Sequence, residues 1–176
     1  MLDVYKIRKD FPILGKKVNN TDLIYFDNAA TSQTPNQVID VISSYYKENN
    51  SNIHRGLHSL SADATNKYEN SRSVIKNHFG AAYEHEIIFT SGTTHGINII
   101  SSGLEKSISS TDELIVSEME HHSNIVPWQM LCEKTGSKLK VIPINDDGTL
   151  DMDEYKSLLT PKVKFVFINH VSNTLG

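Results

Sequence analysis

The residues best suited to chemistry form the run Ser91-Gly92-Thr93-Thr94. An apolar stretch precedes this run and a helix-like pattern follows it, so the run should form a turn between a strand and a helix. The first turn of a helix leaves backbone N–H groups without partners and carries a partial positive charge. A phosphate there is held by the main chain and by threonine hydroxyls, and glycine lets the backbone come close because it has no Cβ atom. The run therefore predicts a phosphate site.

The spacing within the run excludes two common phosphate loops. No Gly-Lys-Ser/Thr follows Gly92, so this is not a P-loop. A Gly-x-Gly-x-x-Gly pattern is also missing, so a dinucleotide is not favoured. The plain alternative is an ordinary helix start that Thr93 or Thr94 caps.

Further polar residues follow the later expected strands. His121 and His122 come after residues 113–117, and Asn173 comes after residues 163–168. Ligands of open α/β sheets bind outside the carboxyl ends of the strands, so these residues and the phosphate turn should meet at one rim. Adjacent side chains of an extended chain point apart, so only one of the two histidines can serve the site. An imidazole can stack on a ring or transfer protons, although both residue types are also common in plain loops and turns.

Two other features are weaker candidates for chemistry. His54 and His58 stand four residues apart, but the intervening Arg55-Gly56-Leu57 lacks the glutamate of the zinc-protease helix motif. A zinc hydrolase is therefore a weak alternative, and we expect no metal. Cys132 lies within an expected helix and should be a buried, unreactive thiol.

Composition sets the broad class of the protein. The chain has 176 residues, a formal net charge of −4 and one cysteine, and its length suits one domain. The mild, mixed charge gives no sign of a nucleic-acid or anionic-membrane surface. One cysteine excludes an internal disulfide and suits a reducing compartment. No apolar run could span a bilayer and the start lacks a signal-peptide core, so we expect a soluble cytoplasmic protein.

The pattern of apolar residues predicts alternating strands and helices. The expected helices cover residues 3–9, 36–47, 61–79, 93–107, 124–134 and 151–159. The expected strands cover residues 23–26, 87–90, 113–117, 139–144 and 163–168. This order predicts an α/β fold with a mostly parallel sheet and helices on both faces. No covering helix follows the last strand, so the sheet is expected to be incomplete.

Five segments form a pattern that goes beyond single motifs. They are Asp27-Asn28-Ala29-Ala30-Thr31, Ile53-His54-Arg55-Gly56-Leu57-His58-Ser59-Leu60-Ser61, Ser91-Gly92-Thr93-Thr94, Met119-Glu120-His121-His122-Ser123-Asn124-Ile125-Val126-Pro127-Trp128 and His170-Val171-Ser172-Asn173-Thr174-Leu175-Gly176. In this order they resemble the N-terminal part of SUF-type cysteine desulfurases, in the class V aminotransferase family of fold-type I pyridoxal-phosphate enzymes. The resemblance covers essentially the whole chain. The Glu-His-His-x-Asn-Ile-Val-Pro-Trp string is highly specific, whereas Gly-Thr-Thr is shared across the wider family.

The resemblance implies roles for four residues toward pyridoxal 5'-phosphate. Thr93 and Thr94, with nearby backbone N–H groups, would hold the cofactor phosphate. His121 would stack on the pyridine ring and act in proton transfer, as the catalytic residue of this part of the site. Asn173 would bond the phenolic oxygen of the ring.

The resemblance also implies contacts with the substrate and with a second subunit. Ala29, Ala30 and His54 would line the substrate pocket, and the loop of Arg55 would lie near the interface of a homodimer. His95 is a departure, because many relatives carry glutamate after the paired threonines. Any contact that this carboxylate makes in the family is therefore in doubt here.

The family reaction releases sulfur from L-cysteine as an enzyme persulfide and leaves L-alanine. The cofactor ring stores the electrons released at Cα, and a thiolate takes the sulfur and passes it to an acceptor protein for iron-sulfur cluster assembly. The Ser-x-His-Lys motif of the Schiff-base lysine, the Asp-Gly-Ala-Gln-like motif, the persulfide cysteine loop and the substrate-carboxylate arginine are not found here. We therefore expect the chain to be an N-terminal portion that does not catalyse the reaction alone.

Within that portion, residues 1–60 would form an N-terminal segment with the active-site and dimer-interface loop. Residues 61–176 would form the first part of a truncated, cofactor-binding large domain. Other functions remain open: a selenocysteine lyase, a sulfinate desulfinase, another class V lyase, or a non-catalytic module that binds a phosphate ligand or a partner.

Overall fold

The computed structural model describes residues 2–176 and divides into two compact units. The N-terminal unit ends at Ile88 and the C-terminal unit covers Phe89–Gly176. The expected division after residue 60 stays a prediction. No helix among the described residues is both long enough and apolar enough to cross a membrane.

The N-terminal unit consists of helices, short helical turns and a two-stranded hairpin. Its elements are α1 (Val4–Arg8), the 3-10 turn Pro12–Gly15, β1 (Lys17–Val18), β2 (Thr21–Asp22), α2 (Asn36–Ser44), the π-helical turn Tyr45–Asn49, α3 (Ser59–Phe79) and the 3-10 turn Glu84–Glu86. Asn19 and Asn20 turn the hairpin with φ angles of 50° and 63°, a conformation that asparagine tolerates better than most residues. α3 ends at Gly80, which adopts the left-handed conformation typical of a helix C-cap.

The C-terminal unit holds a three-stranded parallel sheet with the order β4-β3-β5. Its elements are α4 (Thr93–Leu104), the 3-10 turn Glu105–Ser107, β3 (Glu113–Ser117), the 3-10 turn His122–Asn124, α5 (Val126–Thr135), β4 (Lys138–Ile142), α6 (Met152–Leu158) and β5 (Val163–Phe167). Neighbouring parallel strands need a crossover, and α5 and α6 lie within those connections.

The core of this unit is built around β3. This strand lies between the other two, and all five of its residues are buried. Leu114 and Val116 alternate along the strand and pack in one cluster with Trp128 and Leu131 of α5. Ile115 is equally buried although it falls on the opposite face. Burial on both faces explains the continuous apolar run that predicted this strand.

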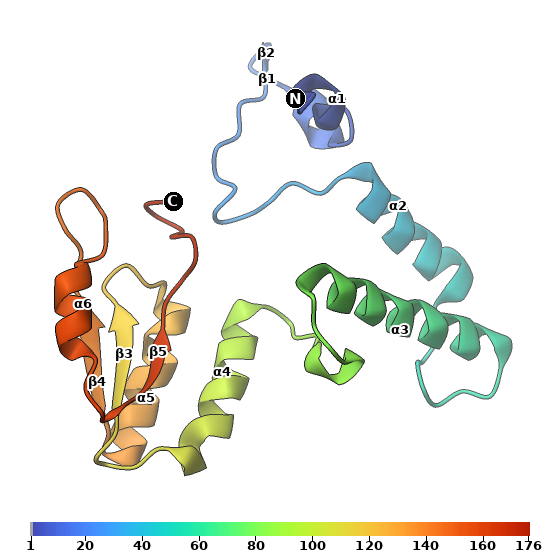
Figure 1. Ribbon diagram of the computed structural model, residues 1–176. Helices are drawn as coiled ribbons and strands as arrows, with labels where there is room; N and C mark the ends of the chain where they lie inside the picture. The colour runs from blue at the N-terminus through green and yellow to red at the C-terminus, as the bar shows by residue number, and fades with distance from the viewer. Residues whose placement is uncertain (1) are drawn as a thin grey trace. The chain divides into compact units, whose positions relative to one another are not determined.

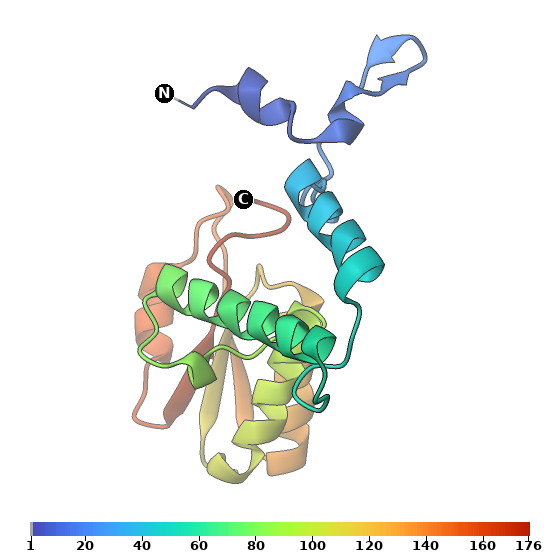
Figure 2. The same ribbon diagram turned by 90° about the vertical axis from the view of Figure 1, so that its right-hand side faces the viewer.

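Helices cover both faces of the sheet. In Figure 1, α5 lies behind the strands with α4 beside it, and α6 lies in front of them. Figure 2, turned by 90°, shows α6 and α5 on opposite sides of the strands. The predicted α/β architecture is therefore confirmed.

Most expected elements are present, but two strands are not. All six helices form, and residues 113–117, 139–144 and 163–168 correspond to β3, β4 and β5. Residues 23–26 and 87–90 were expected to be strands, and this expectation is wrong. Neither segment joins a sheet within the described residues, and a strand requires a neighbouring strand that is hydrogen-bonded along its length. Phe26 is 92% exposed and Ile88 is 71% exposed, so both segments lack the packing that a strand needs.

Glu113 is a buried carboxylate at the start of β3. Its Oε2 lies 3.0 Å from Lys140 Nζ and accepts a 2.9 Å hydrogen bond from Thr160 Oγ1. These two partners, Lys140 first, hold the pKa of the Glu113 carboxyl below its usual value. A carboxyl whose pKa is lower in the folded state stabilises the fold above its unfolded pKa. That stabilisation is lost as the pH falls through the folded pKa.

Glu113→Gln should therefore lower the unfolding temperature at neutral pH, and the gap to the wild type should close toward acid pH. Thermal unfolding followed by circular dichroism across this range measures the gap. Glu133→Gln, an exposed change on α5, is the matched control and should leave the curve unchanged. A gap that does not change with pH would contradict the role of the Glu113 charge.

Candidate active site

An open pocket of about 840 Å³ lies in the C-terminal unit, where the loops that follow β3 and β5 approach the start of α4. It is lined by Ser91, Gly92, Thr93, Thr94, His95, Asn98, His121, Ser123, Asn169, Val171 and Asn173. All four residues predicted to bind the cofactor are among them. The structure thus brings together residues that are up to 80 positions apart in the sequence, from Thr93 to Asn173.

The start of α4 offers unpaired backbone donors to this pocket. Gly92 is the N-cap, and it has no side chain that could accept a hydrogen bond from the first turn. In contrast, Asp151 Oδ1 caps α6 by accepting from the N–H groups of Asp153 and Glu154. The alternative in which Thr93 or Thr94 caps α4 is wrong, because the helix begins at Thr93 and places both threonines inside its first turn.

Gly92 makes room for a ligand at this helix start. Its φ of 145° is a conformation that residues with a side chain rarely adopt, and no atom lies within 4 Å of the place where a Cβ would stand. Free N–H groups, two threonine hydroxyls and an open backbone fit a phosphate group. The pocket therefore suits the phosphate end of pyridoxal phosphate.

His121 is held by the residue two places after it. Its Nδ1 accepts a 3.1 Å hydrogen bond from the backbone N–H of Ser123 and lies 2.8 Å from Ser123 Oγ. A backbone N–H only donates, so the neutral imidazole must carry its proton on Nε2. This arrangement fixes the ring and leaves Nε2 for a ligand or a proton transfer.

The loop after β5 carries Asn173. Ser172 is buried, and its Oγ accepts hydrogen bonds from the backbone N–H groups of Thr174 and Leu175. Asn173 is exposed on this loop, and its Nδ2 is 3.3 Å from Thr174 Oγ1. Since that distance is at the long end for a hydrogen bond, a ligand oxygen could replace Thr174 as the acceptor.

His95 turns back toward the residues that precede the helix. Its Nδ1 accepts a 3.3 Å hydrogen bond from the backbone N–H of Ser91 and lies 3.0 Å from Ser91 Oγ. The His95 side chain thus stabilises the turn that carries Gly92.

The predicted substrate residues belong to the N-terminal unit, and their role stays a prediction. Ala29 and Ala30 lie in an exposed turn. His54 has a φ of 63°, and its Nε2 is 3.2 Å from Glu69 Oε1 on α3. Its ring also meets the Tyr68 ring edge-on, with centroids 5.8 Å apart. Arg55 follows in the same loop, and its place near a dimer interface is likewise a prediction.

The two histidines that raised the zinc alternative have structural roles. His58 Nδ1 accepts a 3.3 Å hydrogen bond from the Ser61 N–H and so caps α3, while His54 faces Glu69. No group of three or more metal-binding side chains occurs within residues 2–176. Cys132 is a free, buried thiol, as expected.

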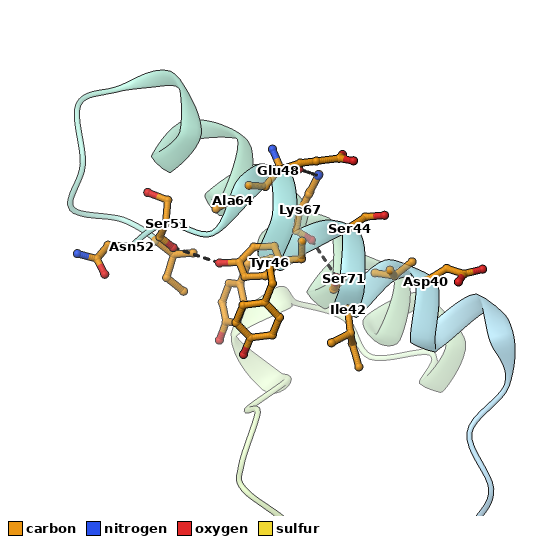
Figure 3. Close-up of a pocket in the computed structure, with 15 residues that line it drawn as sticks. Asp40, Ile42, Ser44, Tyr46, Glu48, Ser51, Asn52, Ala64, Lys67 and Ser71 are labelled. Atoms are coloured by element: carbon orange, nitrogen blue, oxygen red, sulfur yellow. Dashed lines mark hydrogen bonds between the residues drawn. The ribbon is translucent and has the colours of Figure 1, made fainter.

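A larger pocket of about 980 Å³ lies in the N-terminal unit, between α2 with its π-helical turn and α3. Figure 3 shows it. Its lysine, Lys67, donates a 2.7 Å hydrogen bond to Asn49, and Tyr45 donates to the Ser51 carbonyl. None of the residues predicted for the site lines this pocket. The smaller pocket, with its open helix start, is therefore the candidate active site.

Sequence reasoning missed residues that support the candidate site. Glu120, Asn124 and Trp128 were noted only as parts of a specific string, but they form a hydrogen-bonded chain beside His121. The signal was present in their spacing, since residues 120, 124 and 128 fall four apart, the interval of one helical turn. Glu120 precedes the helix, so this spacing alone did not predict the hydrogen bond that Asn124 donates to it.

Comparison with known proteins identifies the family. The family described as Aminotransferase class-V matches residues 24–176. The chain belongs to this family. Class V aminotransferases depend on pyridoxal phosphate. This agrees with the free N–H groups and threonine hydroxyls at the start of α4, which suit a phosphate group.

Curated relatives are named as desulfurases. The chain is 51% identical over 175 residues to a "Probable cysteine desulfurase" of Staphylococcus epidermidis. A protein of the same name from Staphylococcus aureus is 48% identical over 175 residues. Each match covers 99% of this chain and 42% of the relative, so the chain spans less than half the length of these proteins.

Solved structures of cysteine desulfurases share the fold. The apo structure from Thermococcus onnurineus NA1 superposes with a TM-score of 0.89 at 39% identity, covering 100% of this chain and 42% of that one. The CsdA cysteine desulfurase of Escherichia coli gives a TM-score of 0.77 at 29% identity, covering 94% of this chain and 41% of that one. These matches support the prediction that the fold belongs to fold-type I pyridoxal-phosphate enzymes.

Proposed function

We propose that the complete polypeptide containing this chain is a pyridoxal-phosphate-dependent cysteine desulfurase. It would transfer the sulfur of L-cysteine to an enzyme thiol as a persulfide and release L-alanine, in support of iron-sulfur cluster assembly. The names of the relatives support this proposal, because the chain is similar to them over almost all of its length. We infer that the Schiff-base lysine belongs to the rest of the complete polypeptide, since the Ser-x-His-Lys motif does not occur in this chain and no lysine lines the described pocket.

The observation that carries the proposal is the pocket at the uncapped start of α4. Thr93 and Thr94 would bind the cofactor phosphate with their hydroxyls and backbone N–H groups. Asn173, across the same pocket, would donate to the phenolic oxygen of the ring. When bound, pyridoxal phosphate supplies an electron sink for the charge released at the substrate Cα.

His121 would stack on the ring and hold or move a proton at Nε2. Its Nδ1 is already occupied by Ser123, so Nε2 is the ring atom left for chemistry. An imidazole can act as a general acid or a general base in proton transfer.

The remaining parts of the proposal concern partners and location. Ala29, Ala30 and His54 would line the substrate pocket of a homodimer, with the Arg55 loop near the interface. A sulfur-acceptor protein would receive the persulfide sulfur, and the protein would act in the cytoplasm.

Turnover of L-cysteine tests this function. The complete polypeptide with pyridoxal phosphate should release alanine, and His121→Ala should lower turnover by about a hundredfold or more, the usual loss for a general acid–base group. His122→Ala is the matched control, because His122 is adjacent and exposed but does not line the pocket. No alanine from the wild type would overturn the function, and equal losses in both variants would overturn the role of His121.

A further inference from the structure

A buried carboxylate connects the two loops that frame the candidate site. Glu120 is only 7% exposed, and both of its oxygens accept hydrogen bonds. Oε1 accepts from Ser117 Oγ at 2.6 Å and from the backbone N–H of Asn169 at 2.9 Å. Oε2 accepts from Asn124 Nδ2 at 2.8 Å. One side chain thus joins the ends of β3 and β5 to the 3-10 turn that precedes α5.

The orientation of this chain of bonds is fixed from the α5 end. The indole N–H of Trp128 is a donor only, and it donates to Asn124 Oδ1 at 2.9 Å. The amide of Asn124 must then turn its NH₂ group toward Glu120. At the other oxygen, the Asn169 N–H is also a donor only. The side chain at position 120 must therefore accept hydrogen bonds in both directions, which suits a carboxylate and not an amide.

The ends of this network lie next to residues of the pocket. His121 directly follows Glu120 in the chain, and Asn169 itself lines the pocket at the start of the loop that carries Asn173. Asn169 Nδ2 also lies 3.5 Å from the carbonyl of Met119, at the limit of a hydrogen bond. Movement of Glu120 would therefore shift the two walls of the pocket relative to each other.

We propose that Glu120 is a positioning residue that sets the separation between His121 and Asn173, using the fixed order of donors from Trp128 through Asn124. The inference rests on the proposed function, since it assigns Glu120 the task of shaping the cofactor pocket. Glu120 touches neither cofactor nor substrate in this account and acts through the loops that it joins.

The order of donors and acceptors can be tested by exchanging the carboxylate of Glu120 and the amide of Asn124. Glu120→Gln places an NH₂ group against the NH₂ group of Asn124, and Asn124→Asp places a carboxylate against the Glu120 carboxylate. In the double variant, the introduced amide would donate to the introduced carboxylate, which would still accept from Trp128, so every donor again meets an acceptor. The double variant should therefore recover what each single variant loses.

The experiment compares the complete polypeptide in four forms: wild type, Glu120→Gln, Asn124→Asp and the double variant. Affinity for pyridoxal phosphate is measured by titration, and amide hydrogen exchange of residues 169–176 is measured without cofactor. An unmatched pair of buried polar groups should weaken cofactor binding about tenfold in each single variant. Exchange of residues 169–176 should rise in both. Glu133→Gln, an exposed change on α5, should alter neither quantity.

The double variant should bind within about threefold of the wild type, because the matched pairing is restored. Losses that simply multiply in the double variant, or single variants that match the wild type, would overturn the role of Glu120. A wild type that does not bind pyridoxal phosphate would overturn the proposed function instead. In that case the exchange measurements alone would still show whether Glu120 fixes the loop of Asn173.

Discussion

Replacing Trp128 with alanine is expected to destabilise the C-terminal unit by about 3–5 kcal/mol, the range for removing a large buried aromatic side chain. Trp128 is 1% exposed and lies in the cluster that covers β3. Its ring stacks on Phe167 of β5, with centroids 3.5 Å apart and planes 5° from parallel. Its Nε1 also donates to Asn124, so the change would leave Asn124 Oδ1 without its partner. The substitution therefore removes both the packing of the indole ring and its hydrogen bond to Asn124.

Chemical unfolding of the complete polypeptide, followed by far-ultraviolet circular dichroism, measures this loss. Fluorescence is a poor probe, because the substitution removes the one tryptophan that this chain contributes to the signal. Met130→Ala, a change on the same helix at a residue 62% exposed, should cost no more than about 0.5 kcal/mol. Trp128→Phe should fall between the two, since it keeps a stacked ring and removes the N–H donor. A small loss in Trp128→Ala would show that this cluster is not the core of the unit.

The second large effect is expected at the start of α4, where Thr93 and Thr94 would bind the cofactor phosphate. Thr94→Ala should weaken binding of pyridoxal phosphate about tenfold to a hundredfold, because a hydrogen bond to a charged group contributes about 1.5–3 kcal/mol. The change should scarcely alter binding of pyridoxal, which lacks the phosphate. Titration of the cofactor-free complete polypeptide with each ligand separates the two cases.

Thr111→Ala is the matched control for this prediction. Thr111 precedes β3, at the opposite end of that strand from the pocket, and does not line it. Equal losses of affinity for both ligands in Thr94→Ala would mean that the hydroxyl does not face the phosphate. An affinity for pyridoxal phosphate within about twofold of the wild type would also contradict the assignment.

The sequence was most informative for the C-terminal unit. β3, β4 and β5 are short segments rich in Leu, Ile, Val and Phe, and this pattern correctly predicted all three strands. Ligands gather at the carboxyl ends of parallel strands, and this rule predicted that Thr93, His121 and Asn173 lie at the same edge of the sheet. The structure places all three in one pocket.

Other features depend on contacts that the sequence does not reveal. Residues 23–26 and 87–90 have strand-like composition, but strand formation also requires a neighbouring strand, and neither segment joins a sheet in the described chain. The hydrogen bond from the Asn169 N–H to Glu120 joins residues 49 positions apart, so no local pattern could predict it. The hydrogen bond from the Ser91 N–H to His95 Nδ1 depends on the rotamer of His95, which the sequence does not specify.

The central claim is that the start of α4 holds the phosphate of pyridoxal phosphate. A crystal structure of the complete polypeptide grown with pyridoxal phosphate tests it most directly. We expect phosphate oxygens within hydrogen-bonding distance, about 2.7–3.2 Å, of the backbone N–H groups of Thr93 and Thr94, with the ring between His121 and Asn173. A bound cofactor whose phosphate lies elsewhere, with this helix start left to solvent, would contradict it.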